Sequence, residues 1–220
     1  MAHYLITGCS TGIGEALARE AVKRGHTVLG AARRAEKLEA LARELGAAFT
    51  PLTLDVSDKA AVRAALSGIE PLPDVVILNA GVGDFDNAAC FDLSVHERSF
   101  ATNYFGVLNV VDALFPRMLE RRRGVFVATS SLAAFRAMPN SAAYGASKAA
   151  LSTAFESLRL TYGKWSGLKF LTIHPGFVET PMTAPNKTPM PFIWKPAKAA
   201  RYILNGIEKG RLHINFPWPM

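Results

Sequence analysis

One stretch of the sequence decides the fold: Tyr4-Leu5-Ile6-Thr7-Gly8-Cys9-Ser10-Thr11-Gly12-Ile13-Gly14. Its first four residues are typical of a short buried strand, and residues 15–24 after it carry apolar side chains at helical spacing. A glycine-rich turn between a strand and a helix lets the backbone approach a phosphate, which the free N–H groups and positive dipole end of the helix then favour. The stretch therefore predicts a phosphate cradle. A tight turn that binds no ligand is the alternative.

The same alternation of strand and helix continues through the chain. Apolar runs predict strands at Tyr4–Thr7, Thr27–Ala31, Phe49–Leu54, Val75–Leu78, Gly124–Thr129, Leu168–Ile173 and near Arg211–Ile214. The clearest later helical patterns are Arg34–Leu45, His96–Arg121, Ala142–Tyr162 and Pro196–Lys209. This order predicts an α/β fold, a doubly wound parallel sheet of about seven strands with helices on both faces. Ligands of such sheets bind outside the carboxyl ends of the strands.

Composition limits the class of protein further. The 220 residues, half of them apolar, fit one domain over residues 1–220. No apolar run approaches the roughly 20 residues that span a bilayer, and the N-terminus enters a strand without a signal-like segment. The only two cysteines, Cys9 and Cys90, predict reduced thiols and a cytoplasmic location.

Charge and metal-binding patterns do not indicate further partners. The net charge of +7 comes from scattered lysines and arginines without interleaved aromatic residues, so we expect no nucleic-acid partner. The densest basic run, Arg121–Arg123, closes a predicted helix, where cations meet the negative dipole end. The histidines are not paired, and Asp84 and Asp86 lack a matching ligand cluster, so no metal site is predicted.

A second motif carries the candidate chemistry. Tyr144 and Lys148 stand four residues apart on a predicted helix and so share one face. A lysine ammonium beside a phenol favours the phenolate, which suits a tyrosine that carries a proton. Ser131 lies thirteen residues before Tyr144. Taken alone, the pair would also fit an exposed Tyr and Lys on a helix surface.

Together these motifs resemble the short-chain dehydrogenase/reductase family in its single-domain branch, over essentially the whole chain. The resemblance assigns three further segments to cofactor binding beside the glycine loop. These are Asp55-Val56, Asn79-Ala80-Gly81 and the run Pro175-Gly176-x-Val178-x-Thr180. Leu78 stands where a further Asn is common in the family.

The resemblance also implies a mechanism, in which hydride passes between a nicotinamide and a carbonyl carbon. Tyr144 would exchange the proton on the carbonyl oxygen, Ser131 would fix that oxygen, and Lys148 would hold the nicotinamide ribose and lower the pKa of the tyrosine. Asn103 completes the family's tetrad and would maintain a water path to Lys148. Ser130 is the alternative serine, and Asn103 could instead only bond backbone groups.

The end of the second strand bears on cofactor choice. Arg33-Arg34 follow it, and no acidic residue that would hold a ribose 2′-hydroxyl appears before Glu36. Arg33 is placed to pair with a 2′-phosphate, with Arg34 as the second candidate and Ser10 or Thr11 as added donors. We therefore expect NADP(H). The alternative is that both arginines are solvated at the start of the next helix.

Several functions fit this pattern. We expect an NADPH-dependent carbonyl reductase or alcohol dehydrogenase. A cofactor-binding sensor or scaffold without turnover and a 3-oxoacyl-thioester reductase are the alternatives, while the epimerase branch fits less well because its glycine loop is spaced differently. Four prolines in 181–195 predict a broken substrate lid, in which Met182, Met190, Phe192, Ile193 and Trp194 could form an apolar lining. Lys187 and Lys195 are the only cations in this lid, so medium-sized apolar or aromatic carbonyl compounds are the expected substrates.

Two further features complete the expectations. Small residues on the predicted helix Ala142–Tyr162 would permit close packing of another helix, and relatives pair through it, so a homodimer or homotetramer is expected. His174 directly precedes Pro175-Gly176, and we interpret it as a structural or indirectly acting residue rather than as a catalytic one.

Overall fold

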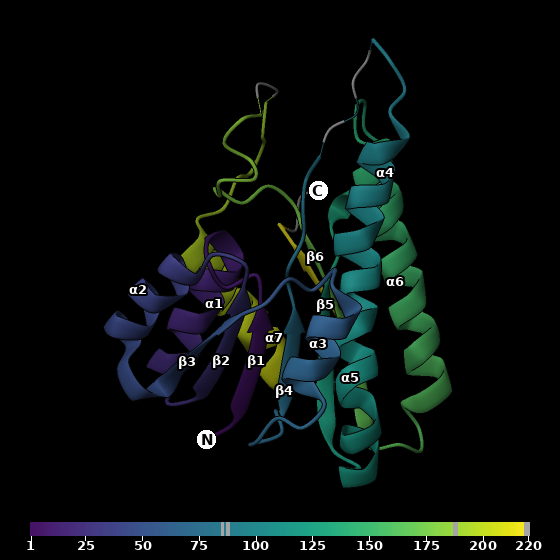
Figure 1. Cartoon of the computed structure of the whole chain (residues 1–220). Helices are drawn as coiled ribbons and strands as arrows, with labels where there is room; N and C mark the ends of the chain where they lie inside the picture. Colours follow the sequence, from purple (N-terminus) through teal and green to yellow (C-terminus); the bar gives the residue numbers. More distant parts are fainter. Residues whose placement is uncertain (85, 87–88, 187–188, 218–220) are drawn as a thin grey trace.

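The computed structural model describes residues 1–84, 86, 89–186 and 189–217. Its centre is a parallel sheet of seven strands in the spatial order β3-β2-β1-β4-β5-β6-β7 (Figure 1). The strands are β1 (His3–Thr7), β2 (Thr27–Ala32), β3 (Phe49–Thr53), β4 (Val75–Leu78), β5 (Gly124–Thr129), β6 (Leu168–Pro175) and β7 (His213–Phe216). The strand order reverses between β1 and β4, so the crevice expected of doubly wound sheets lies at the carboxyl ends of these two strands.

Helices cover both faces of the sheet. They are α1 (Gly12–Lys23), α2 (Ala35–Leu45), α3 (Lys59–Leu66), α4 (Leu93–Phe100), α5 (Gly106–Arg121), α6 (Ala142–Tyr162) and α7 (Pro196–Glu208). Helices α1, α2 and α7 pack on one face, and α3, α5 and α6 pack on the other. The predicted doubly wound α/β architecture is therefore confirmed.

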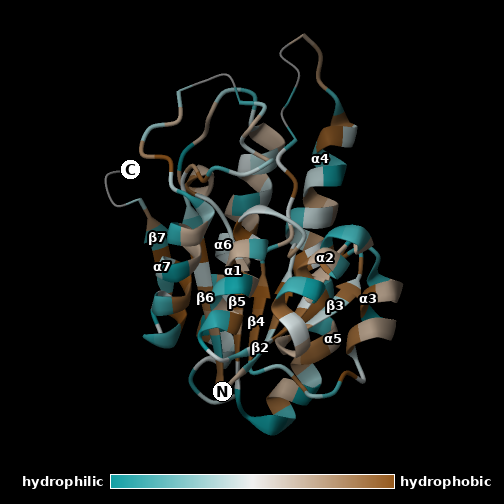
Figure 2. Cartoon of the chain, turned by 90° about the vertical axis from the view of Figure 1, so that its left-hand side faces the viewer, coloured by the Kyte–Doolittle hydropathy of each residue, from teal (hydrophilic) through white to brown (hydrophobic). Residues whose placement is uncertain are grey.

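The core consists of two apolar layers, one on each face of the sheet. Neighbouring residues of a strand point to opposite faces. Ile6 of β1 accordingly joins the layer under α1 and α7, whereas Leu5 joins the layer under α5 and α6. Both side chains are fully buried. Because both faces are covered, the inner strands are continuously apolar, which Figure 2 shows as brown strands between helices with teal outer surfaces.

Two sequence-based boundaries are wrong. The last strand is His213–Phe216 rather than Arg211–Ile214, because Gly210 takes a φ of +65° and the amide of Arg211 still donates to the carbonyl of Gly206 at the end of α7. The expected helix His96–Arg121 begins earlier, at Leu93, and is divided by a π-helical turn at Ala101–Phe105.

The lid that was expected at 181–195 contains no helix among its described residues, in keeping with its prolines. Its base is closed by a pair of main-chain hydrogen bonds, in which Trp194 donates to Phe177 and Glu179 donates to Trp194, each over 3.0 Å. Lys195 and Glu179 form an ion pair of 2.7 Å beside them. Trp194 stacks on Phe216 at 4.8 Å between ring centres, so it anchors the lid to the sheet.

No helix in the described part of the chain is both long enough and apolar enough to cross a bilayer. In the same part of the chain, no group of three His, Cys, Asp or Glu side chains lies close enough to hold a metal ion.

Candidate functional site at the carboxyl edge of the sheet

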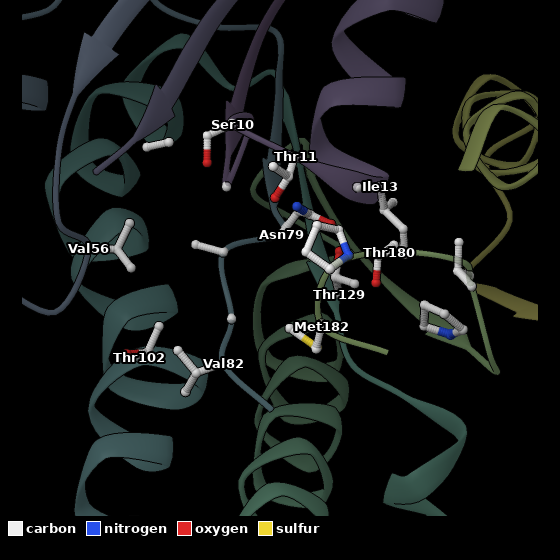
Figure 3. A pocket seen from close by; sticks show the side chains of 18 of the residues that line it. Ser10, Thr11, Ile13, Val56, Asn79, Val82, Thr102, Thr129, Thr180 and Met182 are labelled. Atoms are coloured by element: carbon white, nitrogen blue, oxygen red, sulfur yellow. The ribbon is translucent and has the colours of Figure 1, made fainter. Parts of the chain in front are cut away.

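A cavity of about 390 Å³ lies at the carboxyl ends of the strands, on both sides of the reversal in strand order. It runs from the glycine loop after β1 to the start of α6. Figure 3 shows Ser10 and Thr11 at one side of this cavity, Val56, Thr102 and Val82 at another, and Met182 of the lid facing into it.

Nearly all residues expected to bind a cofactor or to act in catalysis line this one cavity. From the loop after β1 and the next two strand ends come Gly8, Ser10, Thr11, Gly12, Ile13, Arg33, Arg34, Asp55 and Val56. From the strands beyond the reversal come Asn79, Ala80, Gly81, Ser131, Tyr144, Lys148, Pro175, Gly176, Val178 and Thr180. Gly14 and Asn103 are absent from the lining and stand directly behind it.

The glycine loop leaves no space for larger residues. Gly8 has a φ of +73°, and Gly12 has a φ of +64°. A Cβ atom placed on Gly14 would lie 2.2 Å from the main-chain oxygen of Gly8. Thr7 fixes the facing loop, because its hydroxyl accepts hydrogen bonds from the amides of Asn79 and Ala80, each at 3.0 Å.

The start of helix α1 is open toward the cavity. Thr11 is the N-cap residue, but its side chain makes no capping hydrogen bond. The Thr11 hydroxyl accepts a hydrogen bond from Arg34 instead. The first-turn amides of a helix have no partner within the helix, so an uncapped N-terminus beside glycines is suited to bind a phosphate oxygen.

The two arginines after β2 occupy different positions. Arg34 donates through Nε and Nη2 to Ser10 Oγ, at 3.1 and 2.7 Å, and through Nη2 to Thr11 Oγ1 at 2.9 Å. Arg33 is 65% exposed and lies 3.7 Å from Asp55 Oδ2. Partial burial works to raise the pKa of Asp55, but two hydrogen bonds from Ser57, assisted by Arg33, outweigh it and lower that pKa. Arg34 therefore holds the loop, while most donors of Arg33 face solvent.

At the other end of the cavity, Ser131, Tyr144 and Lys148 come together. Ser131 and Tyr144 are joined by a side-chain hydrogen bond. Lys148 Nζ lies 5.8 Å from the centre of the Tyr144 ring and donates to the main-chain oxygen of Thr129 at 2.8 Å. Ser130, the alternative serine, points to the rear and donates to the main-chain oxygen of Lys148 at 2.8 Å. The hydroxyl that contacts the tyrosine is therefore that of Ser131.

Burial dominates the electrostatics of this end. It lowers the pKa of Lys148 to about 8, from an ordinary value of 10.5. It raises the pKa of Tyr144 above the usual value, although the hydrogen bond from Ser131 acts in the opposite direction. The pKa of Tyr144 is raised overall, because desolvation penalises the phenolate more than the neighbouring groups stabilise it. The expected lowering of the tyrosine pKa by Lys148 stays a prediction.

Asn103 is buried in the π-helical turn and fixes the loop after β4. Its Oδ1 accepts from the amide of Val82 at 2.8 Å, and its Nδ2 donates to the oxygen of Val82 and to Ser147 Oγ, each at 3.0 Å. These contacts join the loop to helix α6. The expected role beside Lys148 stays a prediction; the contacts seen are those of a positioning residue.

Several lining residues were not foreseen from the sequence. Of these, Val82, Thr102 and Thr129 face the cavity in Figure 3. Thr129 Oγ1 is buried and has no hydrogen-bond partner within the described residues. Its place at the end of a predicted strand, directly before Ser130 and Ser131, was a signal that could have identified it.

Of the five apolar lid residues, Met182 lines the cavity, whereas Met190, Phe192, Ile193 and Trp194 do not. The expected lining by the last four is therefore wrong for this structure. Trp194 packs on the sheet as described above, and Phe192 and Ile193 are exposed. Lys187 lies outside the described residues.

The sheet, its strand order and the glycine loop define a Rossmann-like α/β protein. Residues 2–190 match the model of the short chain dehydrogenase family. An "uncharacterized oxidoreductase" of Myxococcus xanthus is 38% identical over 222 residues, covering 98% of this chain and 87% of its own. A serine 3-dehydrogenase of Rhizobium radiobacter is 38% identical over 187 residues, covering 81% and 73% respectively.

A solved structure shows the same likeness in three dimensions. A short-chain dehydrogenase of Sphingobium yanoikuyae in complex with NADPH superposes with a TM-score of 0.91 at 25% identity, covering all of this chain and 89% of its own. The chain belongs to the short-chain dehydrogenase/reductase family of oxidoreductases.

Proposed function

We propose that this protein is an NADPH-dependent oxidoreductase that interconverts a carbonyl compound and its alcohol, with Ser131, Tyr144 and Lys148 in contact with the reacting groups and Asn103 behind them. One observation carries the proposal. Three polar side chains, one from the segment after β5 and two from α6, converge at the end of a cavity whose other end is an uncapped helix N-terminus beside two arginines. A scaffold protein would have no use for the buried ammonium of Lys148, which burial destabilises.

The lining fits a dinucleotide. The open first turn of α1 offers donors to a pyrophosphate, and the glycines permit close approach. Thr129, at the end of β5, adds to the lining between the glycine loop and Ser131 (Figure 3). When bound, a nicotinamide would supply or accept the hydride at the carbonyl carbon.

The chain's own residues would handle the proton. Because the pKa of Tyr144 is raised, its hydroxyl is protonated at neutral pH and donates to the carbonyl oxygen during reduction. Ser131 donates a hydrogen bond to the same oxygen and keeps it within reach of the tyrosine. Lys148, beside the ring, can return a proton to the phenolate that Tyr144 becomes, since its pKa of about 8 allows it to release a proton near neutral pH.

The preference for NADP(H) rests on the basic end of β2. Arg33 has donors free for a 2′-phosphate, and Arg34 keeps the hydroxyls of Ser10 and Thr11 at the same place. A phosphate here would pair with at least one guanidinium, which binds phosphate bidentately. NADH lacks this phosphate and would leave Arg33 paired only with Asp55.

The substrate end favours uncharged carbonyl compounds. Lys148 is the only cation that the described lining presents there, and its ammonium is already bonded to Thr129. Lys195 of the lid is neutralised by Glu179. Val82 and Met182 supply apolar surface opposite the reacting groups. These features support medium-sized apolar or aromatic ketones and aldehydes as substrates.

A panel of substrates tests this function, with NADPH consumption measured for reduction and NADPH formation from NADP⁺ for oxidation. An aryl ketone, a 3-oxoacyl thioester, a 3-oxo acid and, in the oxidative direction, serine distinguish the candidates. We expect the aryl ketone to react fastest. Preference for the thioester would favour a 3-oxoacyl-thioester reductase instead. Absence of turnover with all compounds, despite tight NADPH binding, would favour a cofactor-binding sensor or scaffold protein.

We further propose that residues 1–220 act as one catalytic domain and pair through α6 in a homodimer or homotetramer. Two large apolar side chains on this side of the molecule support pairing, because Phe105 and Leu160 are 55% and 71% exposed. The small residues Ala146, Ala149, Ala150 and Ala154 of α6 would allow close approach of a second helix.

A further inference from the structure

Behind the catalytic residues lies a buried histidine that the proposed mechanism does not use. His174, near the end of β6, is 1% exposed. Its Nε2 lies 3.1 Å from Ser152 Oγ on α6, and its Nδ1 lies 2.9 Å from Asn215 Oδ1 on β7. Phe135 covers one face of the ring at 4.5 Å between ring centres. The imidazole is therefore held on three sides by different elements.

The contact with Ser152 continues as a chain of hydrogen bonds. Ser152 Oγ donates to Ser130 Oγ at 2.8 Å and also lies 3.0 Å from the main-chain oxygen of Lys148. Ser130 Oγ donates to that same oxygen at 2.8 Å. The chain thus begins at His174 on β6 and ends on the backbone of Lys148 in α6, passing through the residue next to Ser131.

The protonation state of the imidazole sets the direction of this chain. Burial lowers the pKa of His174 to about 4, so the ring is neutral at physiological pH and has one N–H donor and one acceptor. With the proton on Nε2, the ring donates to Ser152, Ser152 to Ser130, and Ser130 to the Lys148 oxygen. In the other tautomer Nδ1 donates to Asn215 Oδ1, the atom that faces it, and Nε2 accepts from the Ser152 hydroxyl, so the ring bonds Ser152 in either case.

The chain fixes the geometry on which the proposed chemistry depends. Lys148 is attached to the end of β5 twice, through its main-chain oxygen to Ser130 and through Nζ to the oxygen of Thr129. His174 also directly precedes Pro175, whose main-chain oxygen lies 3.5 Å from Ser131 Oγ. Two routes therefore lead from His174 to the reacting groups, one through α6 and one through β6.

We propose that His174, acting through Ser152 and Ser130, is a positioning residue that holds the end of β5 and helix α6 in the register needed for turnover. This inference rests on the proposed function of Ser131, Tyr144 and Lys148. Small displacements of such groups are costly, because proton and hydride transfer require reacting atoms within a narrow range of distances. A core histidine that only filled space would have no such effect on turnover.

Two amide substitutions distinguish these roles. The amide nitrogen of glutamine reaches about as far as Nε2, whereas that of asparagine reaches only as far as Nδ1. His174→Gln therefore keeps an amide group that can donate to or accept from Ser152, and His174→Asn loses this contact. We expect kcat to fall about tenfold or more in His174→Asn and to stay within about threefold of wild type in His174→Gln, with NADPH affinity unchanged in both. Equal kcat values in the two variants, or losses that follow only their melting temperatures, would overturn the proposal.

Ser152→Ala cuts the same chain from the helix side and leaves His174 in place. It should lower kcat to a similar extent, and combining it with His174→Asn should add little, because both substitutions remove one interaction. Additive losses would show that the two residues act separately. His26→Asn, a substitution far from the site, serves as the control and should leave kcat unchanged.

A second measurement does not depend on turnover. Amide hydrogen exchange at residues 144–152 should be faster in His174→Asn and Ser152→Ala than in wild type and His174→Gln, because the helix start is less firmly held. If wild type reduces no carbonyl compound, the proposed function fails, while the exchange rates still decide whether this chain holds α6. Identical exchange in all four proteins would refute it.

Discussion

The ammonium of Lys148 donates a hydrogen bond to the main-chain oxygen of Thr129 across 2.8 Å, inside the protein and with no carboxylate partner among the residues that the structure describes. The side chain is 4% exposed, and its pKa falls to about 8 because burial penalises the charged form. A charge held in this way costs stability. Its presence at the base of the cavity indicates that the position serves chemistry rather than folding.

Replacing this lysine should therefore stabilise the protein. The pKa shift from 10.5 to about 8 means that the charged lysine lowers the free energy of unfolding by about 3 kcal/mol at neutral pH. Loss of its hydrogen bond to Thr129 costs the variant about 1 kcal/mol in the opposite direction. We expect Lys148→Met to unfold in urea with about 2 kcal/mol more stability than wild type at pH 7, while turnover is lost.

The stability difference between Lys148→Met and wild type should depend on pH in a defined direction. Because the pKa of Lys148 is lower in the folded protein, the unfolded chain binds more protons between pH 8 and 10.5, and wild-type stability rises through this window. The advantage of Lys148→Met should accordingly be complete below pH 8 and shrink as the pH approaches 10.5. A variant that is less stable than wild type at pH 7 would contradict the assignment of a destabilising buried charge.

Removing the hydroxyl of Tyr144 tests the proton carrier. Tyr144→Phe keeps the ring beside Lys148 but cannot donate to a carbonyl oxygen. We expect kcat to fall by about 100-fold or more, as is usual when a positioned acid is lost. NADPH titration of the same variant is the control and should give wild-type affinity. Turnover that remained at the wild-type level would assign the proton to another group.

The two arginines should have separable effects on the cofactor. Wild type is expected to bind NADPH at least about tenfold more tightly than NADH, a difference of about 1.4 kcal/mol. Arg33→Ala should remove most of this preference and leave NADH affinity nearly unchanged, because its donors are free for a phosphate. Arg34→Ala should weaken the binding of both cofactors, because the glycine loop loses the hydrogen bonds that Arg34 donates to Ser10 and Thr11.

Fluorescence titration of the three proteins with each cofactor measures these differences. Equal affinities of wild type for NADPH and NADH would end the assignment of a 2′-phosphate site. A loss of preference in Arg34→Ala but not in Arg33→Ala would exchange the roles of the two residues.

The sequence predicted the framework of the site well because its signals are local. The strand-turn-helix pattern at Tyr4–Gly14 and the periodicity of Ala142–Tyr162 depend on nearby residues, and the latter helix has the bounds that were expected. The π-helical turn around Asn103 was not foreseeable, because the asparagine bonds a loop 21 residues away. The raised pKa of Tyr144 likewise depends on burial, which spacing alone does not reveal.

Pairing through α6 predicts a measurable mass. Sedimentation equilibrium at micromolar concentration should give a multiple of the 23.8 kDa chain mass. Leu160→Glu places a charge on an apolar side chain that is 71% exposed, and should shift the protein toward monomer if the α6 surface is the interface. A wild-type protein that sediments only as a monomer would exclude the proposed assembly.

The last prediction concerns substrate size, through Met182 of the lid, which lines the cavity. Met182 packs against Gly83, where an added Cβ would meet its Cγ at 2.9 Å, and its side chain faces the cavity in Figure 3. Met182→Ala removes this contact surface, so we expect KM for an aryl ketone to rise about tenfold, or about 1.4 kcal/mol. The effect on kcat should be small, because the reacting groups lie on α6 and in the segment after β5.

Met190→Ala provides the matched control, since it shortens another methionine of the same lid that does not line the cavity. It should leave KM unchanged, so a general loosening of the lid can be separated from loss of a substrate contact. Steady-state kinetics with one aryl ketone and one small aliphatic ketone completes the comparison, because a small substrate makes less use of the methionine. Equal increases in KM for both variants would mean that the lid acts as a whole and that Met182 does not select substrates.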